Sequence, residues 1–178
     1  EKELLKAFPY KEGYSLYIGI PFCPSTCLYC SFTSYSIDQF ENIVQDYLEA
    51  LLKELDFVAK TYAHKELQTM YIGGGTPTSL KEEDLEYLLY EVNKRFPFSK
   101  IQEITVEAGR PDSLNFEKLK ILKKYGVTRI SINPQSMNDK TLKLIGRNHF
   151  AQDIKEKFNL ARQAGIDNIN MDMICGLP

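Results

Sequence analysis

The sequence predicts an α/β fold in which short parallel strands alternate with helices. Five short runs are rich in apolar, β-branched or aromatic residues, and the intervals between them have a helical pattern. These runs are residues 16–20, 70–72, 103–108, 129–133 and 168–174. Residues 125–130 and 164–169 are alike, since each segment is typical of a helix stop, a short turn and a strand. This repeated βα module predicts a parallel sheet with right-handed crossovers.

The first two helices are predicted from start signals that precede apolar faces. Asp38 and Glu41 have the spacing of a capping box, in which two side chains satisfy free backbone N–H groups. Ser79 and Glu82 have the same spacing ahead of the second helix. The apolar positions that follow are Ile43, Tyr47, Leu48, Leu51, Leu55 and Val58 in the first helix, and Leu85, Leu88, Leu89 and Val92 in the second.

Three further helices are predicted between the later strands. One covers about residues 115–125 and ends at Gly126, and the others cover roughly residues 138–145 and 151–164, the last ending at Gly165. Glycine is the natural residue at such an end, because it takes the left-handed backbone conformation at no steric cost.

The length favours one ordinary domain over residues 1–178, long enough to bury a hydrophobic core. The net charge of −2, with neither a basic tract nor a polybasic helix, argues against nucleic-acid and membrane-surface partners. No apolar run approaches the ~20 residues that span a bilayer. The chain begins at Glu1 without a methionine and stops just after a strand-like segment, so we expect a core fragment of a longer enzyme that lacks its N- and C-terminal parts.

Three cysteines with the spacing C-x3-C-x2-C carry the strongest chemical signal. Cys23, Cys27 and Cys30 place three soft thiolates on one loop directly after a predicted strand, and soft sulfur ligands suit iron–sulfur clusters. A [4Fe–4S] cube normally has four cysteine ligands, so a cube here would keep one iron without a cysteine. An open coordination position is typical of a reactive metal site.

A zinc site or a disulfide framework fits these cysteines less well. A structural zinc site needs four ligands, usually in two separated pairs, and the sequence has no second C-x2-C or paired histidines. A disulfide framework does not suit three close cysteines and a distant fourth, Cys175, which we expect to be a small buried hydrophobic residue. Chance clustering is the remaining alternative. Because thiolates persist in reducing compartments, we expect a cytoplasmic protein.

A glycine-rich loop follows the second predicted strand. Gly73, Gly74 and Gly75 precede Thr76-Pro-Thr78, and three consecutive glycines let a backbone approach a ligand closely with bare N–H and C=O groups. The loop is no Walker motif, because no Gly-Lys-Ser/Thr follows. The alternative is a plain tight turn into the next helix.

Polar side chains follow or interrupt the later strands. Glu107 ends the third strand, Gln135 follows the fourth, Arg147 lies beyond a short helix, and Asp172 interrupts the fifth. Each could be structural, and Glu107 could pair with Arg110 or Arg129. Together they suit a zwitterionic, ribose-bearing cosubstrate, because carboxylates bind ammonium and hydroxyl groups and a guanidinium binds a carboxylate.

These polar and glycine-rich motifs all fall at the carboxyl ends of the predicted strands. Barrels built from βα units keep their active sites at that face. A flat, doubly wound sheet also binds ligands there, so the position of the motifs alone leaves both architectures open.

The chain resembles the radical S-adenosylmethionine (SAM) superfamily, specifically the oxygen-independent coproporphyrinogen III oxidase group. The resemblance covers residues 17–178 and five ordered motifs: Y-x-x-I-P-F-C-x3-C-x-Y-C, GGGTPT, T-V-E-A, S-I-x-P-Q-S and D-M-I-x-G-L-P. The stretches V-E-A-G-R-P-D-S and I-S-I-N-P-Q-S-M-N-D resemble the HemZ-type coproporphyrinogen dehydrogenases. This resemblance implies a partial (βα)6 TIM-like barrel, of which the chain carries about five βα units.

The resemblance also implies a site and a reaction. Cys23, Cys27 and Cys30 would hold a [4Fe–4S] cluster whose fourth iron binds SAM. Reductive cleavage would give a 5′-deoxyadenosyl radical, which attacks propionates of coproporphyrinogen III and leaves vinyl groups in haem biosynthesis. An electron donor such as flavodoxin or ferredoxin would serve the cluster. By resemblance, the SAM contacts are Tyr17, Tyr29, Gly74, Gly75, Thr76, Glu107, Gln135, Arg147 and Asp172.

One position departs from the oxidase pattern and keeps other functions open. The anaerobic oxidases have a further cysteine two residues after the third ligand, where this chain has Phe32. Phe32 resembles the HemW-type haem chaperones, which bind the cluster and SAM and traffic haem. An iron–sulfur structural protein that never binds SAM is a third alternative. We expect the two histidines, His64 and His149, to be surface or structural residues.

Overall fold

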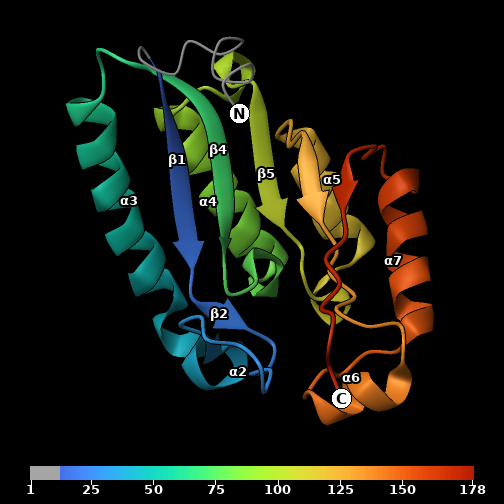
Figure 1. The fold of residues 1–178 in the computed structure, drawn as a ribbon. Helices are drawn as coiled ribbons and strands as arrows, with labels where there is room; N and C mark the ends of the chain where they lie inside the picture. The colour runs from blue at the N-terminus through green and yellow to red at the C-terminus, as the bar shows by residue number, and fades with distance from the viewer. Residues whose placement is uncertain (1–12) are drawn as a thin grey trace.

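Five parallel strands form one curved sheet in the order β1-β4-β5-β6-β7 (Figure 1). The computed structural model describes residues 13–178. The strands are β1 (Gly13–Ile20), β4 (Glu66–Gly74), β5 (Glu103–Glu107), β6 (Arg129–Ser131) and β7 (Ile169–Asn170). A second, two-stranded parallel sheet pairs β2 (Phe22–Cys23) with β3 (Tyr35–Ser36). Every strand pair of the main sheet is parallel, as the repeated βα module predicts.

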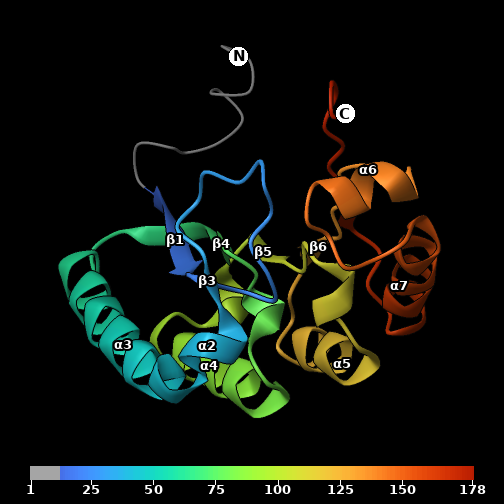
Figure 2. The same ribbon diagram turned by 90° about the horizontal axis from the view of Figure 1, so that it is seen from below.

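Four long helices cover one side of the main sheet. In the view of Figure 2, α3, α4, α5 and α7 form an outer arc around the strands, while the opposite side of the sheet lies open. Their bounds are Val44–Thr61, Glu82–Arg95, Phe116–Lys124 and Ala151–Gln163. A curved parallel sheet with helices on its outer side is part of a βα barrel, so the predicted fold class is confirmed.

The shorter helices lie near the carboxyl ends of the strands (Figure 1). They are α2 (Ile37–Phe40) and α6 (Asp139–Leu144), with 3-10 turns η1 (Glu41–Ile43), η2 (Pro77–Ser79) and η4 (Pro111–Ser113). A further 3-10 turn, η3 (Phe98–Lys100), precedes β5 at the amino end of the sheet. In residues 13–178, no helix combines the length and apolar character needed to cross a bilayer.

Alternation along the strands separates the core from the open side of the sheet. Ile18 and Ile20 of β1 are buried, and so are the matching apolar residues of the neighbouring strands. These are Met70, Ile72, Ile104, Val106 and Ile130, which share one core with the leucines of α3, α4 and α5. The intervening residues Tyr17, Tyr71 and Glu107 therefore point to the open side.

Helix ends test the start and stop signals of the sequence. Asn115 and Asn138 cap α5 and α6, since their side-chain oxygens accept backbone N–H bonds from the first turn. Gly126 and Gly165 follow their helices with φ of 74° and 82°, the left-handed values expected of helix stops.

Both predicted capping boxes are wrong. Asp38 lies inside α2, and Ile43 precedes α3 with no side-chain cap. The helix starts late because Ile37 and Phe40 of α2 first pack against the core. Lys81, not Ser79, precedes α4, and the Ser79 hydroxyl instead donates to the carbonyl of Phe22 at 3.4 Å.

The last two strands are shorter than predicted. β7 ends at Asn170, although a single bridge between Gln135 and Met173 continues the pairing. Pro134 has no N–H to donate to a ladder, and the side-chain oxygen of Asn133 accepts the N–H of Asp172 at 3.2 Å. The regular ladder is therefore interrupted here, while backbone bonds such as that from the N–H of Gln135 to the carbonyl of Asp172, at 3.0 Å, keep the two segments together.

Candidate functional site

A cavity of about 260 Å³ lies at the carboxyl ends of the strands. It brings together side chains from the loop after β1 and from the ends of β4, β5, β6 and β7. Of the residues predicted for the site, the cavity is lined by Cys23, Cys27, Cys30, Tyr29, Gly74, Gly75, Thr76, Glu107, Gln135, Arg147 and Asp172. Segments more than a hundred residues apart in sequence therefore meet at one place.

The cysteine loop is fixed by its contacts with the end of α6. The N–H of Leu28 donates to the carbonyl of Ile145 at 3.0 Å, and Cys30 closes a turn onto the carbonyl of Cys27 at 3.1 Å. Gly146 has φ 79°, and a Cβ there would stand 3.3 Å from the carbonyl of Thr26. The loop and the α6 end are thus in close backbone contact, which holds Cys27 almost completely buried.

The three thiols suit a cluster better than a single ion. Among residues 13–178, no group of three or more His, Cys, Asp or Glu side chains is arranged to hold one metal ion. A cube makes a different demand, since each cysteine binds a separate iron and the sulfurs need not converge on one point. Three soft thiols around one polar cavity, without a fourth, meet that demand with one iron left open.

Cys23 is also joined to the glycine-rich loop. Its Sγ lies 3.4 Å from the hydroxyl of Thr76. Burial raises the pKa of the Cys23 thiol, although the Thr76 hydrogen bond and the charge of Arg110 act in the opposite direction. Burial therefore disfavours the charged form of Cys23, and the two neighbouring groups offset only part of this effect.

The glycine-rich loop packs closely against the cysteine loop. Its N–H groups are not bare, because Gly75 and Thr76 donate to the carbonyls of Ile20 and Phe22, each at 2.7 Å. A Cβ on Gly75 would stand only 2.6 Å from the Phe22 carbonyl and 3.1 Å from Cys23 Sγ. The expectation of free N–H groups is wrong at these positions, and the glycines instead allow close backbone packing.

Glu107 is held by two donors on the open side of the sheet. The Tyr71 hydroxyl donates to Oε1 at 2.6 Å, and the N–H of Gly74 donates to Oε2 at 3.2 Å. Burial raises the pKa of the Glu107 carboxyl, while these two hydrogen bonds act to lower it. The alternative of an ion pair between Glu107 and Arg110 or Arg129 is not found, because Arg110 pairs with Asp112 and Arg129 with Glu103 among the described residues.

Arg147 is almost fully engaged by the protein itself. Nη1 donates to the carbonyls of Gly109 and Asn133 at 3.1 and 2.8 Å. Nε and Nη2 donate to the Tyr29 hydroxyl at 3.2 and 2.9 Å. Since a guanidinium has five N–H groups, one N–H on Nη2 remains for a ligand among the described contacts. Arg147 thus joins three loops and can offer only part of its fork to a carboxylate.

Gln135 and Asp172 lie side by side at the end of the sheet. The N–H of Gln135 donates to the carbonyl of Asp172 at 3.0 Å, and Gln135 has φ 63°, which is unfavourable for a residue other than glycine. Asn170 donates to the exposed carboxylate of Asp172 at 2.8 Å. Asp172 is therefore oriented by its neighbours and is open to a ligand, as a binding carboxylate needs to be.

Tyr17 is the predicted site residue that the structure sets apart. It lies on the open side of β1, is 61% exposed and stacks on Tyr71 at 5.8 Å between ring centroids. It lines a neighbouring cavity that shares Gly74 and Phe32 with the cysteine cavity. A ligand in the cysteine cavity would therefore contact Tyr17 only if it extended along the sheet into the neighbouring cavity.

Two residues that line the site, Arg110 and Asn133, were not predicted as site residues. Arg110 is buried beside Cys27, and Asn133 links Arg147 to Asp172 through its carbonyl and its side chain. Arg110 was considered only as a partner of Glu107. The sequence did contain a signal for Arg110, because it follows Glu107 by three residues. The loop after β5 therefore also lies at the carboxyl edge of the sheet.

Two expectations about isolated residues are settled by their burial. Cys175 is exposed, so the expectation of a buried hydrophobic residue is wrong. It follows the short β7 in a loop, beyond the part of the sheet that helices cover. His64 is exposed in the turn after α3. His149 is buried, and both of its ring nitrogens lack a hydrogen-bond partner among the described residues.

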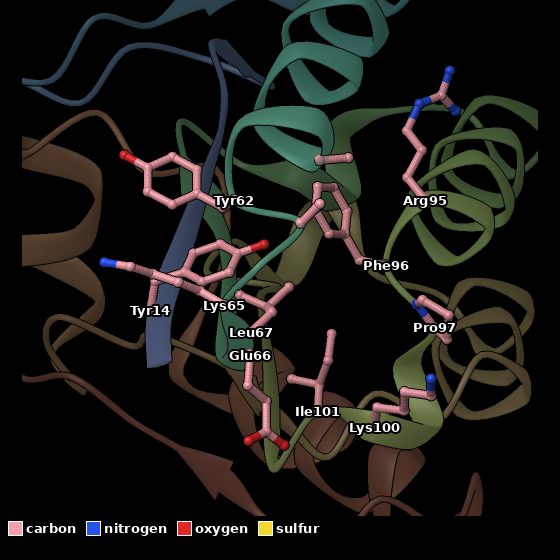
Figure 3. A pocket seen from close by; sticks show the side chains of 12 residues that line it. Tyr14, Tyr62, Lys65, Glu66, Leu67, Arg95, Phe96, Pro97, Lys100 and Ile101 are labelled. Atoms are coloured by element: carbon pink, nitrogen blue, oxygen red, sulfur yellow. The ribbon is translucent and has the colours of Figure 1, made fainter. Parts of the chain in front are cut away.

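A second cavity, of about 350 Å³, lies at the opposite end of the sheet near the amino ends of β1, β4 and β5 (Figure 3). Tyr14 and Tyr62 stack there at 5.0 Å, and Arg95 on its rim already pairs with Asp56 and Glu91. None of the predicted site residues lines this cavity. The residues that the sequence predicts for the site therefore lie at the carboxyl edge of the sheet and not around this second cavity.

Comparison with protein families gives a match over almost the whole chain. Residues 17–178 match the Radical SAM superfamily. The chain is 48% identical over 171 residues to the oxygen-independent coproporphyrinogen-III oxidase-like protein HemZ of Bacillus subtilis, covering 94% of this chain and 34% of that protein. It is 46% identical over 166 residues to the heme chaperone HemW of the same organism, covering 92% of this chain and 43% of that protein.

A solved structure has the same fold. Coproporphyrinogen III oxidase (HemN) from Escherichia coli, described as a radical SAM enzyme, superimposes with a TM-score of 0.82 at 29% identity. The match covers 100% of this chain and 41% of that protein. The chain thus spans less than half the length of each of these relatives, and it is similar to both oxidase-like and chaperone proteins.

Proposed function

Because this chain belongs to the radical SAM superfamily, we propose that Cys23, Cys27 and Cys30 bind a [4Fe–4S] cluster and that the adjoining cavity binds SAM. The family implies both cofactors. The observation that carries the proposal is the meeting of three thiols, two carboxylates, two amides and two guanidinium groups in one cavity at the carboxyl edge of the sheet.

Each thiol has a distinct setting that suits a cluster ligand. Cys27 is buried beneath the loop, whereas Cys23 and Cys30 are half-buried at the cavity wall. The thiols must lose their protons to bind iron, and at Cys23 the Thr76 hydroxyl and the Arg110 charge partly offset the burial that raises the thiol pKa. When bound, the reduced cluster would supply the electron that splits SAM into methionine and a 5′-deoxyadenosyl radical.

The remaining polar residues would hold the parts of SAM. We assign Asp172 and Glu107 to the ammonium and hydroxyl groups of SAM, because both carboxylates line the cavity as acceptors. The free N–H of Arg147 would donate to the SAM carboxylate, and Gln135 would add an amide contact. Tyr29 would act through Arg147, whose guanidinium it orients, while the glycine-rich loop sets the distance between SAM and the cysteines.

The proposed substrate is coproporphyrinogen III. Removal of one hydrogen atom from each of two propionate side chains, followed by loss of carbon dioxide and transfer of one electron to an electron acceptor for each, would leave the vinyl groups of protoporphyrinogen IX. The similarity to HemZ and HemN supports this substrate. Residues 1–178 would form the core domain of a longer cytoplasmic enzyme, and a flavodoxin or ferredoxin would donate the electrons.

A haem chaperone is the second candidate, and Phe32 is the observation that favours it. Phe32 stands where the anaerobic oxidases have a further cysteine, and its side chain lines the rim of both neighbouring cavities. The similarity to the heme chaperone HemW is nearly as high as that to HemZ. In this alternative the cluster and SAM sites are retained, and the tetrapyrrole is haem that is carried without decarboxylation.

One anaerobic assay separates these functions. The full-length protein is reconstituted with iron and sulfide and supplied with SAM, a reductant and coproporphyrinogen III, and 5′-deoxyadenosine and protoporphyrinogen IX are quantified together. Matched formation of both products would support the oxidase. Deoxyadenosine without porphyrin product, together with stoichiometric binding of added haem, would support the chaperone. Absence of SAM binding to the loaded cluster would reject both.

A further inference from the structure

Arg110 occupies a position between the cysteine loop and the loop after β5. It follows Glu107 and Gly109 at the carboxyl edge, and its backbone is fixed because its carbonyl accepts bonds from both the N–H and the hydroxyl of Ser113, at 3.1 and 2.8 Å. Its residue exposure is only 2%. A guanidinium buried to this degree requires partners for its charge and its donors.

All five N–H groups of Arg110 have partners. Nε and Nη2 form a two-pronged ion pair with Asp112 at 3.0 and 2.8 Å. Nη1 donates to the Ser25 carbonyl at 3.2 Å, and Nη2 donates to the Ser25 hydroxyl at 3.0 Å. The remaining N–H of Nη1 points to Cys27 Sγ at 3.3 Å. The carboxylate therefore holds one edge of the fork, and the cysteine loop takes the other.

This arrangement has features that a simple ion pair would not require. An Arg–Asp pair needs only the two bonds on the Asp112 edge. Here the pair orients three further donors onto residues 25 and 27, which are 85 and 83 residues away in the sequence. A lysine could neutralise Asp112, but it could not present N–H groups to two places at fixed angles. The contacts of the guanidinium therefore indicate that Arg110 holds the cysteine loop in addition to pairing with Asp112.

We propose that Arg110 is a positioning residue for the cluster, which fixes the Cys27 loop through Ser25 and donates an N–H bond to the Cys27 thiolate. This inference rests on the proposed role of the three cysteines. Hydrogen bonds to ligand sulfurs and nearby positive charge stabilise the more negative, reduced state of an iron–sulfur cluster. Arg110 therefore makes the cluster easier to reduce, which is the condition for cleaving SAM.

The test compares the reduction potential of the cluster in R110K and R110Q with that of the wild-type protein. Both variants and the wild type are reconstituted anaerobically, cluster content is measured from iron and sulfide, and the potential is obtained by redox titration followed by electron paramagnetic resonance. We expect the equilibrium constant for one-electron reduction to fall about tenfold in R110Q, a shift of about 59 mV to lower potential. R110K keeps the charge without the fork and should shift less.

A matched control uses another arginine that makes a two-pronged ion pair. Arg95 binds Asp56 and Glu91 near the opposite end of the sheet, so R95K should leave the potential unchanged. A wild-type protein that forms no cluster would reject the proposed function itself. A wild-type cluster together with an unchanged potential in fully loaded R110Q and R110K would reject only the role of Arg110.

Loss of the cluster in both variants would also decide the question. In that case the melting temperatures of the cluster-free proteins are compared with that of cluster-free wild type. Unchanged melting temperatures would support a role directed at the cluster, because the fold would not need Arg110. A drop in melting temperature that matches the loss of cluster would make Arg110 a structural residue and overturn the proposal.

Discussion

The Tyr29 hydroxyl accepts two N–H bonds from Arg147, at 3.2 and 2.9 Å, although 118 residues separate the two in the sequence. Tyr29 belongs to the cysteine loop, and Arg147 follows α6. Arg147 also binds the carbonyls at the ends of the β5 and β6 segments. One guanidinium therefore connects the proposed cluster loop with the proposed SAM-binding edge, so the two cofactors would depend on the same set of contacts.

Replacing Cys27 by alanine should abolish cluster assembly. Cys27 is the most buried of the three cysteines, and its thiol cannot be replaced by a solvent ligand at that depth. Iron and sulfide content and the brown absorbance of the reconstituted protein give the measurement. Cys175→Ser is the matched control, because Cys175 is exposed and does not line the cavity, and it should load normally. A C27A protein with full cluster content would contradict the ligand assignment.

Replacing Asp172 by alanine should weaken SAM binding and leave the cluster intact. The carboxylate is exposed to the cavity and makes no ion pair with other described residues, so its loss removes a ligand contact without unpacking the core. Hydrogen bonds to charged groups contribute about 1.5–3 kcal/mol, which predicts a dissociation constant roughly 10- to 100-fold higher. Isothermal titration of the loaded protein with SAM provides the value.

The control for Asp172 is Asp167→Asn. Asp167 is exposed and accepts from Arg162 outside the cavity, so this change should not alter SAM affinity. Equal SAM affinity in D172A and wild type would remove Asp172 from the binding site.

Replacing Gln135 by glycine should separate its backbone role from its side-chain role. The φ of 63° costs a non-glycine residue about 1 kcal/mol, so glycine relieves that strain while gaining freedom in the unfolded chain. We expect the free energy of unfolding to change by less than about 1 kcal/mol, while SAM affinity falls. Urea unfolding and SAM titration on the same sample test both halves. A large loss of stability with unchanged SAM affinity would make Gln135 purely structural.

Replacing Gly75 by alanine should push the glycine-rich loop away from the cysteine segment. The added Cβ would stand 2.6 Å from the Phe22 carbonyl and 2.9 Å from the Ile20 carbonyl, both backbone atoms that cannot turn aside. Overpacking of this kind costs about 1–3 kcal/mol, and it should also lower cluster content. Gly19→Ala is the control, since the nearest atom to its Cβ is a Tyr17 ring carbon at 3.6 Å.

His149 should make the protein less stable in mild acid. Burial, reinforced by the charge of Arg147, lowers the pKa of His149 to about 4. An unfolded histidine has a pKa of about 6.5, so between these values the unfolded chain binds the proton and the folded chain does not. The stabilising contribution is complete above pH 6.5 and decreases as pH falls toward 4. From pH 7 to pH 5 the loss is about 2 kcal/mol.

The measurement is urea unfolding of wild type, H149L and H64N at pH 7 and pH 5. The difference in unfolding free energy between the two pH values should shrink in H149L and stay at the wild-type value in H64N, because His64 is exposed. A pH dependence that is equal in all three proteins would show that His149 is charged in the folded state.

Features governed by short segments were predictable from the sequence. The glycine stops at Gly126 and Gly165 and the asparagine caps at Asn115 and Asn138 depend on two or three neighbouring residues, and all are present. The capping box at Asp38 failed because Ile37 and Phe40 are drawn to the core, and tertiary packing outweighed the local signal. The strands predicted over residues 129–133 and 168–174 were too long for a similar reason, since the Asn133 side chain takes the N–H of Asp172 in place of a backbone partner.

The residues that gather at the cavity were predictable as a set, but their contacts were not. Strand ends of a parallel sheet meet at one edge, so Glu107, Gln135 and Asp172 had to lie near one another. The bonds from Arg110 to Cys27 and from Gly75 to Ile20 join distant segments, and no local pattern specifies such pairs. For the same reason, the sequence could not show that most donors of Arg147 were already used.

The backbone bonds from Gly75 and Thr76 to Ile20 and Phe22 have a consequence for how the protein is made. They belong to the packing of β1 against β4, and they require no iron or sulfide. The loop that precedes the first cysteine can therefore be ordered during synthesis, before any metal arrives. Cluster binding would then need no prior ordering of this segment, and slow amide exchange at residues 75 and 76 of the iron-free protein would be its signature.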